Sequence, residues 1–142
     1  MTRFIAGIIA LTVCIASSSP IASAQFSKPT EIVSGKQIND FLTDKDIPIG
    51  QKEFARDYML YAQKDERLEI TVNSERFDTV LRLLDSEGEV VAVNDDADST
   101  TTNSLIFFKV RQSGNYIVRV SAFGGFGGGK FTLSVTKLQV VN

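Results

Sequence analysis

From residue 55 onward, apolar and polar residues alternate one by one in short runs that turn-forming residues separate. In one such run, Leu68, Ile70 and Val72 alternate with polar residues. Successive side chains of a strand point to opposite faces of a sheet, so a period of two predicts strands with one buried face. No stretch of ten or more residues shows the apolar stripe of an amphipathic helix. The sequence therefore predicts an all-β protein.

The predicted strands are short and recur about every 8–12 residues, with Gly, Asn, Asp and Ser in the turns between them. This spacing is typical of antiparallel sandwiches, and a long polar crossover favours a jelly-roll or Greek-key β-sandwich of about eight strands. We expect strands around residues 32–35, 37–43, 58–62, 68–73, 77–84, 89–94, 104–111, 116–120 and 131–135.

Two of these strands carry apolar residues on both faces. Val80 and Leu84 point outward if their neighbours face the core, and Phe107 does the same in a later strand. Two interpretations remain open. Either the N-terminal segment covers this second face through Phe41 and Phe54, or the face is an exposed apolar patch used for binding.

The first 24 residues predict a signal peptide. Arg3 gives a positive start, residues 4–16 are an apolar run too short to cross a membrane, and Ala22-Ser23-Ala24 is a small-residue cleavage site. We therefore expect a secreted or periplasmic protein with no membrane anchor after cleavage. The expected organisation is a leader (1–24), an N-terminal segment with short strands that belongs to the sandwich (25–54), and the main sandwich body (55–142).

The residue types that are missing exclude several classes of function. The sequence has no His, and its one Cys, Cys14, lies in the predicted leader. Ser-His-Asp triads, Cys-His dyads and zinc sites built on His or Cys are thereby excluded from the mature chain. The chain has 15 Lys and Arg against 17 Asp and Glu and no basic cluster, so no nucleic acid partner is expected. We predict that the protein is not an enzyme, with a carboxylate-based hydrolase as the weaker alternative.

The acidic loop after residue 93 is the best candidate for a metal site. Calcium prefers several hard oxygen ligands, and Asp95, Asp96 and Asp98 supply carboxylates on one loop, to which the sandwich could add Asp78. The spacing follows only the first half of an EF-hand loop, because Ser99 stands where that loop has glycine. Two interpretations stay open: a calcium site, or a turn whose side chains cap their own backbone.

Four aromatic residues are candidates for an exposed binding surface: Tyr61, Phe107, Phe123 and Phe126. The last two lie at or within the glycine-rich stretch 124–129. With Lys130 this stretch fits G-x-x-x-x-G-K, but Phe131 replaces the required Ser or Thr, and the stretch lies between two predicted strands. We interpret it as a flexible hairpin rather than a phosphate-binding loop.

The order of motifs resembles the bacterial pre-peptidase C-terminal domain over about residues 32–138. The motifs that carry the resemblance are Asp57-Tyr58-x-Leu60, Phe77-Asp78-Thr79, Asn94-Asp95-Asp96, Ser113-Gly114-Asn115-Tyr116 and Phe131-x-Leu133-x-Val135. The resemblance implies a β-sandwich of the kind appended to secreted peptidases, with an accessory role in secretion, localisation or substrate attachment and with calcium bound in some members. Here we expect only a signal peptide, and no peptidase domain, ahead of the module.

Two functions follow as hypotheses. The first is a non-enzymatic secreted module that attaches to an extracellular protein or polysaccharide. The second is a peptidase-associated chaperone or inhibitor that acts in trans on a separately encoded secreted protease.

Overall fold

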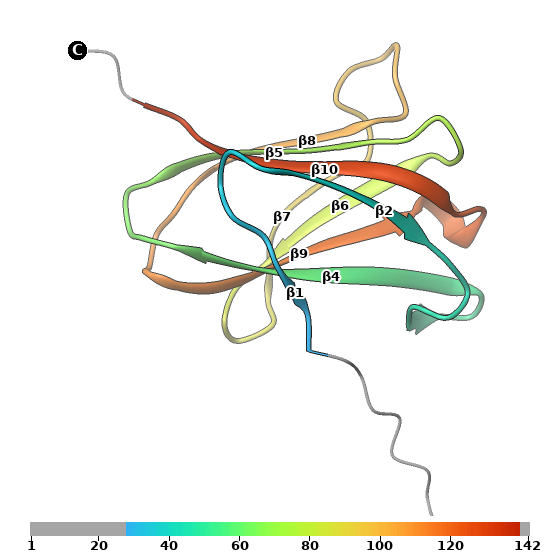
Figure 1. Cartoon of the computed structure of the whole chain (residues 1–142), viewed down its shortest axis with the longest axis horizontal. Coiled ribbons are helices and arrows are strands. Elements are labelled where there is room, and N and C mark those ends of the chain that lie inside the picture. Colours follow the sequence, from blue (N-terminus) through green and yellow to red (C-terminus); the bar gives the residue numbers. More distant parts are fainter. Residues whose placement is uncertain (1–27, 140–142) are drawn as a thin grey trace, which may run out of the picture.

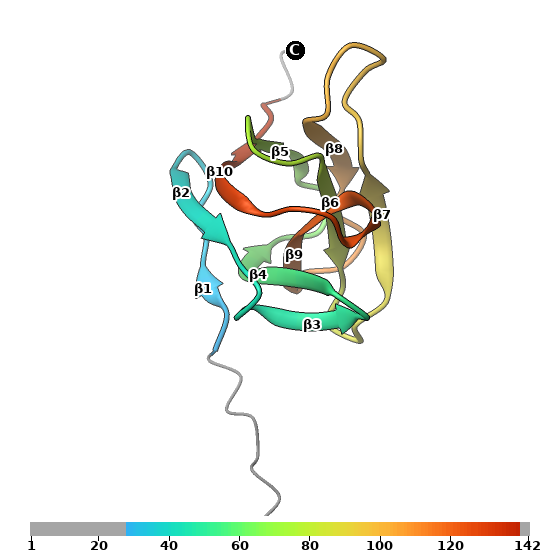
Figure 2. The same cartoon turned by 90° about the vertical axis from the view of Figure 1, so that its right-hand side faces the viewer.

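A computed structural model describes residues 28–139, which form two β-sheets packed face to face (Figures 1 and 2). The larger sheet contains β1 (Thr30–Glu31), β3 (Ile47–Gly50), β4 (Glu53–Ala62), β6 (Thr79–Leu84), β7 (Val90–Asn94) and β9 (Gly114–Ala122). The smaller sheet contains β2 (Gln37–Leu42), β5 (Arg67–Asn73), β8 (Ser104–Lys109) and β10 (Gly129–Lys137). The described residues contain one short 3₁₀ turn, Phe123–Gly125, and no other helix. The predicted all-β sandwich is confirmed.

The strand order is that of a jelly roll. The larger sheet runs β1-β4-β9-β6-β7, with β3 also on β4, and the smaller sheet runs β2-β10-β5-β8. The strands form nested pairs around one central hairpin. β6 pairs with β7, and the strands before and after this hairpin pair in turn: β5 with β8, β4 with β9 and β2 with β10. Successive pairs in this series alternate between the two sheets, as in a double-sheet jelly roll of eight strands. β1 and β3 are additions to that frame.

The core lies between the inner faces of the two sheets. Ile70, Leu83 and Val118 have no exposed surface, as their positions in the alternating pattern predict. The ring of Phe131 packs edge-on against the rings of Tyr58 and Phe77, with centroids 6.3 Å apart in both pairs. Every second residue of the strands contributes to this core, so the period of two in the sequence is the period of burial.

The N-terminal segment differs from the expectation. The predicted strand 32–35 does not form; the strand there is β1, at Thr30–Glu31. β1 pairs with β4 in parallel, so the sandwich is not entirely antiparallel. β3 was not anticipated and pairs with the start of β4 (Figure 2). Strands of two and four residues are too short to show a period, which is why the sequence pattern did not reveal them.

The interpretation that Phe41 and Phe54 cover a second apolar face is wrong. Phe41 is 55% exposed on β2, and Phe54 packs against the core. Val80 and Leu84 are buried on the larger sheet, whereas Phe107 is 63% exposed on the smaller one. The smaller sheet therefore leaves aromatic side chains in solvent on its outer face.

The predicted signal peptide lies outside the described residues. Within residues 28–139, no helix has the length and apolar character needed to cross a membrane.

Candidate functional site

The outer face of the smaller sheet is lined by neutral polar side chains from neighbouring strands. Thr132 of β10 lies between Asn39 of β2 and Asn73 of β5 in the strand register. One step along, Ser134 lies between Gln37 and Thr71. Their neighbours along each strand face the core, so these amides and hydroxyls face solvent together. We call this set the ladder face: Gln37, Asn39, Thr71, Asn73, Thr132 and Ser134.

An exposed phenylalanine lies on the strand at each side of the ladder face. Phe41 on β2 lies opposite Lys130 of β10, and Phe107 on β8 lies opposite Glu69 of β5. Because β2 and β8 are the two outer strands of this sheet, the rings lie toward opposite sides of the polar surface. Exposed aromatic rings beside hydrogen-bonding groups are typical of recognition surfaces.

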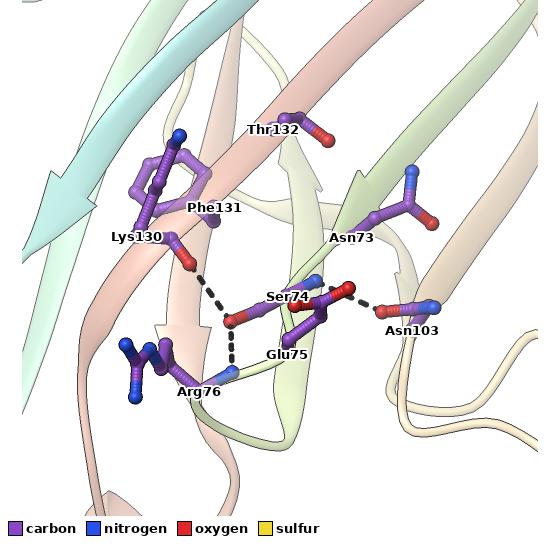
Figure 3. A pocket seen from close by; sticks show the side chains of 8 residues that line it. All are labelled: Asn73, Ser74, Glu75, Arg76, Asn103, Lys130, Phe131 and Thr132. Carbon is purple, nitrogen blue, oxygen red and sulfur yellow. Dashed lines mark hydrogen bonds between the residues drawn. The ribbon is translucent and has the colours of Figure 1, made fainter.

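A pocket of about 540 Å³ lies at one end of the ladder face, where Asn73 and Thr132 belong to its lining. Figure 3 shows the residues that line it: Asn73, Ser74, Glu75, Arg76, Asn103, Lys130, Phe131 and Thr132. They come from three segments far apart in the sequence: the end of β5 with the loop after it, the residue before β8, and the start of β10. The volume is in the range of small-molecule sites.

Ser74 holds these three segments together (Figure 3). Its backbone N–H donates to Asn103 Oδ1 at 2.9 Å, and its hydroxyl donates to the carbonyl of Lys130 at 2.9 Å. The same hydroxyl oxygen accepts the backbone N–H of Arg76 at 3.0 Å and of Phe77 at 3.3 Å. The loop that forms one wall of the pocket is therefore fixed by hydrogen bonds.

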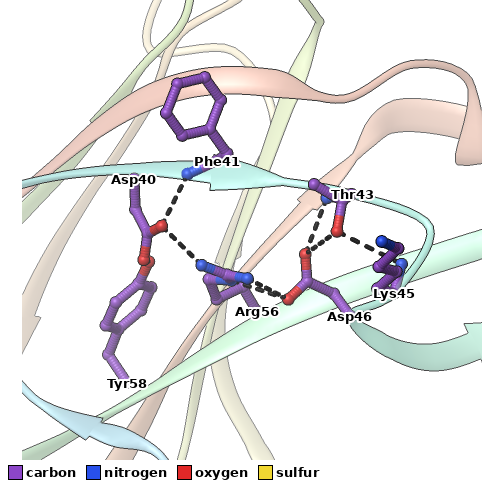
Figure 4. A network of polar contacts seen from close by, with 7 residues as sticks. All are labelled: Asp40, Phe41, Thr43, Lys45, Asp46, Arg56 and Tyr58. Atoms are coloured by element: carbon purple, nitrogen blue, oxygen red, sulfur yellow. Dashed lines mark hydrogen bonds and ion pairs between the residues drawn. The ribbon is translucent and has the colours of Figure 1, made fainter.

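A polar network fixes β2, the edge strand that carries Asn39 and Phe41 (Figure 4). Arg56 of β4 donates to Asp40 Oδ1 at 2.5 Å and to Asp46 Oδ1 at 2.7 Å, and Tyr58 donates to Asp40 Oδ2 at 2.9 Å. Since β2 and β4 belong to different sheets, these bonds join the two sheets along one side of the sandwich.

The network also shifts the pKa values of its members. Burial raises the pKa of Asp40, but hydrogen bonds from Arg56, the Phe41 amide and Tyr58 outweigh it and leave the pKa below its usual value. Burial and the Asp40 carboxylate raise the pKa of Tyr58 far above its usual range. Asp40 is therefore ionised and Tyr58 neutral at physiological pH.

The structure brings together some of the predicted metal ligands. The hydroxyl of Ser104 lies 2.9 Å from the carbonyl oxygens of both Thr79 and Asp95, so the segments that carry Asp78 and Asp95 are neighbours. Burial raises the pKa of Asp78, and the negative charges of Asp96 and Asp95 raise it further. Asp78 Oδ1 is buried and has no hydrogen-bond partner among residues 28–139. Asp98 instead accepts hydrogen bonds from the amide and hydroxyl of Thr100, within its own loop.

The described residues contain no group of three or more acidic side chains arranged to hold a metal ion. Asn94 donates to the carbonyl of Asp96 and accepts the backbone N–H of Leu105, which are bonds of a capped turn. The loop between β7 and β8 stands away from the sheets (Figure 1). Calcium at Asp78, Asp95, Asp96 and Asp98 stays a prediction.

The four aromatic residues predicted as a binding surface are all exposed, but they do not form one patch. Phe107 lies on the smaller sheet and Tyr61 on β4 of the larger sheet. Phe123 and Phe126 lie in the connection between β9 and β10, where Phe126 is 82% exposed. Only Phe107 flanks the ladder face.

Sequence reasoning missed the ladder face, the pocket and Phe41. The signal that was present is the run of polar residues at every second position of β2, β5 and β10. Such a run is expected on any solvated strand face, and only the strand register shows that the three runs lie side by side.

The outer face of the larger sheet has a different chemistry. Val90 and Val93 of the edge strand β7 are exposed there, and Arg119 forms a two-point ion pair with Asp57 at 2.7 and 2.8 Å. Arg82, next to Arg119 in the register, donates to the hydroxyl of Ser121. The two outer faces of the sandwich thus differ, one mixing apolar residues with arginine and the other uncharged and polar at its centre.

Comparison with known proteins supports the fold. Residues 56–122 match the profile of the family described as the bacterial pre-peptidase C-terminal domain, which confirms the resemblance found in the sequence. A search of curated proteins finds no match.

Solved structures similar to this chain include two proteins whose functions are described. One is the pre-peptidase C-terminal domain of a collagenase from Bacillus anthracis, with a TM-score of 0.56, 18% identity, and coverage of 77% of this chain and 95% of that one. The other is PliG of Aeromonas hydrophila, a periplasmic inhibitor of g-type lysozyme, with a TM-score of 0.58, 11% identity, and coverage of 78% and 96%. At these identities the likeness shows the fold.

Proposed function

Because residues 56–122 carry a bacterial pre-peptidase C-terminal domain, we propose that this protein is a non-catalytic module that attaches to a polysaccharide outside the cytoplasm. Domains of this family are non-catalytic, and the proposal assigns no chemical step to any residue. Attachment takes place on the ladder face, with Phe41 and Phe107 at its sides.

The observation that carries the proposal is the uncharged polar surface at the centre of the smaller sheet. Its amides and hydroxyls both donate and accept hydrogen bonds, as the hydroxyls of a sugar chain require. They repeat from strand to strand at about 4.8 Å, so an extended chain lying across the strands meets similar groups repeatedly. The exposed rings supply apolar surface for the C–H faces of sugar rings.

A polysaccharide suits this surface better than a protein does. Stable protein interfaces have an apolar centre and a polar rim. The ladder face has the reverse arrangement, with polar groups at its centre and phenylalanine at its sides. Many weak contacts to a repeating chain add up through multivalency, so no deep apolar pocket is needed.

The test is the retardation of residues 25–142 in native gels that contain a soluble polysaccharide: hydroxyethyl cellulose, xylan or polygalacturonate. We expect at least one of them to slow the protein, and the double variant N73A/T132A to migrate as in an empty gel. Neither side chain makes a hydrogen bond within residues 28–139, so the variant keeps its fold. The matched control S86A/N115A changes two exposed polar residues outside the ladder face and should bind like the parent. Equal retardation of both variants would refute the ladder face as the site.

A second candidate is a chaperone or inhibitor that acts in trans on a separately encoded secreted enzyme, a protease in the first instance. The fold shared with the Aeromonas hydrophila inhibitor of g-type lysozyme supports it. In this case the exposed valines of β7 are the expected contact surface. Slower turnover of a secreted protease or of g-type lysozyme with an equimolar amount of this protein would favour the second candidate. Unchanged turnover together with gel retardation would favour the first.

Secretion is part of the proposal. The family match and the periplasmic origin of one structural neighbour support export, and the predicted cleavage follows Ala24. The mass of protein recovered from the medium or periplasm should correspond to a chain that begins at Gln25. A mass that includes the leader, or a lipid on Cys14, would contradict it.

A further inference from the structure

We propose that the pocket at the end of the ladder face binds the carboxylate of an acidic sugar unit, so that the module prefers a polyuronate to a neutral polysaccharide. This inference rests on the proposed function, because it assigns the class of sugar that the same surface recognises. The pocket has two cations, a rigid wall and further polar groups that suit such a ligand.

The cations of the pocket are Arg76 and Lys130. Neither forms an ion pair within residues 28–139, whereas Arg56, Arg119 and Lys137 are each bound to a carboxylate there. Figure 3 shows both side chains on the same side of the pocket, one above the other. An unpaired guanidinium is suited to a carboxylate because its N–H groups match the two oxygens, and the ammonium at the other end of the same side adds a second positive charge to the pocket.

The wall that carries Arg76 is held against the glycine-rich connection. A Cβ atom on Gly129, where φ is +128°, would lie 3.0 Å from Cβ of Arg76, and one on Gly127 would lie 3.1 Å from Cβ of Phe77. With the four hydrogen bonds of Ser74, this close packing fixes the backbone under the guanidinium. A fixed wall loses little conformational entropy on binding, which favours a specific site.

The other side of the pocket carries amides. The oxygen of Asn103 accepts the Ser74 N–H, so the amide NH₂ of Asn103 remains as a donor, and Asn73 and Thr132 complete that side. Amide and hydroxyl groups suit the ring hydroxyls of a sugar whose carboxylate meets the cations. Phe41 lies opposite Lys130 in the register, so a sugar unit next to the pocket also meets an exposed ring.

Glu75 is the one acid of the lining. It reduces the positive potential of the pocket, which fits a ligand with a single negative charge on each unit rather than a densely charged one. Removal of the Glu75 charge should therefore strengthen the binding of an acidic polymer, whereas removal of the cations should weaken it.

The experiment compares three polymers with residues 25–142 in low-salt buffer: polygalacturonate, its fully methyl-esterified form, which is neutral, and dextran sulfate. We expect polygalacturonate to bind about tenfold or more tightly than its ester, with a preference that weakens as salt is added. The variant R76Q/K130Q should lose that preference but keep the binding of the ester. E75Q should strengthen the binding of polygalacturonate.

The control variant K64Q/R111Q removes the same charge from two cations outside the pocket, and it should behave like the parent. A loss of preference in this control equal to that in R76Q/K130Q would overturn the assignment, since net charge alone would then explain it. If only dextran sulfate depends on Arg76 and Lys130, the anion is a sulfate and the carboxylate assignment is wrong. Equal binding of acid and ester would refute this inference and leave the proposed function standing, whereas binding to none of the polymers of either experiment would refute the proposed function itself.

Discussion

Asp40 is a residue whose charge contributes to holding the two sheets together. Its carboxylate lies on β2 of the smaller sheet and accepts hydrogen bonds from Arg56 and Tyr58 of the larger sheet (Figure 4). Asp46 occupies the other side of the same guanidinium. The pair is partly exposed to solvent, so its contribution is smaller than that of a fully buried ion pair.

The lowered pKa of Asp40 predicts an acid-sensitive contribution to stability. A carboxyl group with a folded-state pKa below its unfolded value stabilises the fold above the unfolded pKa, near 3.8, and that stability is lost as the pH falls through the folded value. We expect D40N to be destabilised by about 1–3 kcal/mol at pH 7 and by much less at pH 2–3. Urea melts at several pH values measure this difference. D44N, at an exposed position, should show no such change, and a D40N deficit independent of pH would contradict the prediction.

Asp78 is a residue in electrostatic conflict with its surroundings. One of its oxygens is buried without a partner among residues 28–139, and the negative charges of Asp96 and Asp95 add to burial in raising its pKa. Such a group lowers stability unless a cation or a proton neutralises it.

Melting curves with and without calcium test this site. If calcium binds, the folded state gains about 2.7 kcal/mol at a hundredfold excess over Kd, which is a shift on the order of 10 °C in melting temperature. We expect D78N to raise the stability of the calcium-free protein by about 1 kcal/mol and to abolish the calcium shift. E87Q, in an exposed turn, is the control. The absence of a calcium shift in the parent would leave the loop as a capped turn.

Among the elements, the connection from β9 to β10 requires glycine both because other segments pack closely against it and because its backbone turns with positive φ values. Gly128 lies so close to β2 that an added Cβ would meet the carbonyl oxygen of Leu42 at 2.7 Å. Gly127 and Gly129 also have positive φ values, which glycine adopts without strain. The stretch predicted as a flexible hairpin is therefore packed against the loop after β5 and the end of β2.

Replacing Gly128 with alanine should therefore be destabilising, by about 1–3 kcal/mol, because the new methyl group displaces backbone. Gly114 is the matched control, since nothing lies within 4 Å of an added Cβ there and its φ is not positive. G114A should be neutral or slightly stabilising, because alanine restricts the unfolded chain. Denaturant midpoints of the two variants measure the difference. Equal midpoints would show that the connection moves away from Leu42 at little cost.

At the scale of the whole molecule, the jelly roll pairs the beginning of the domain with its end. Gln37 lies opposite Ser134, and β4 pairs with β9 across most of the domain. Such pairs form only after long loops close, and this closure costs conformational entropy before any contact compensates for it.

This topology predicts slow folding. Sandwiches dominated by distant pairings fold in milliseconds to seconds, and we expect the same range for residues 25–142. Stopped-flow refolding followed by tyrosine fluorescence measures the rate. Refolding within microseconds would contradict the dependence on distant pairs.

The variant L83A should unfold at a lower denaturant concentration, with a loss of about 2–5 kcal/mol in the free energy of unfolding, because Leu83 is fully buried.

The residues of the core could be predicted, whereas the candidate site could be predicted only in part. The burial of Ile70, Leu83 and Val118 could be predicted from the alternation of apolar and polar residues, because every second side chain of a strand points to the same face of the sheet. Phe107 was predicted as exposed and lies beside the ladder face, but Phe41 was offered as a residue that covers a second apolar face and is itself exposed. The difference arises because the face that a strand turns to solvent depends on its partners as well as on its own residues.

The sequence by itself determined the strands of the jelly-roll frame, their inner faces, the all-β class and the exclusion of His-based catalysis. These properties depend on residue type and local period, which the backbone geometry of a strand converts directly into burial. Only the tertiary structure decided that Asn39, Thr132 and Asn73 form one row and that Ser74 joins three distant segments around a pocket. Those arrangements depend on strand register and on hydrogen bonds between residues far apart in the chain, for which a local pattern carries no information.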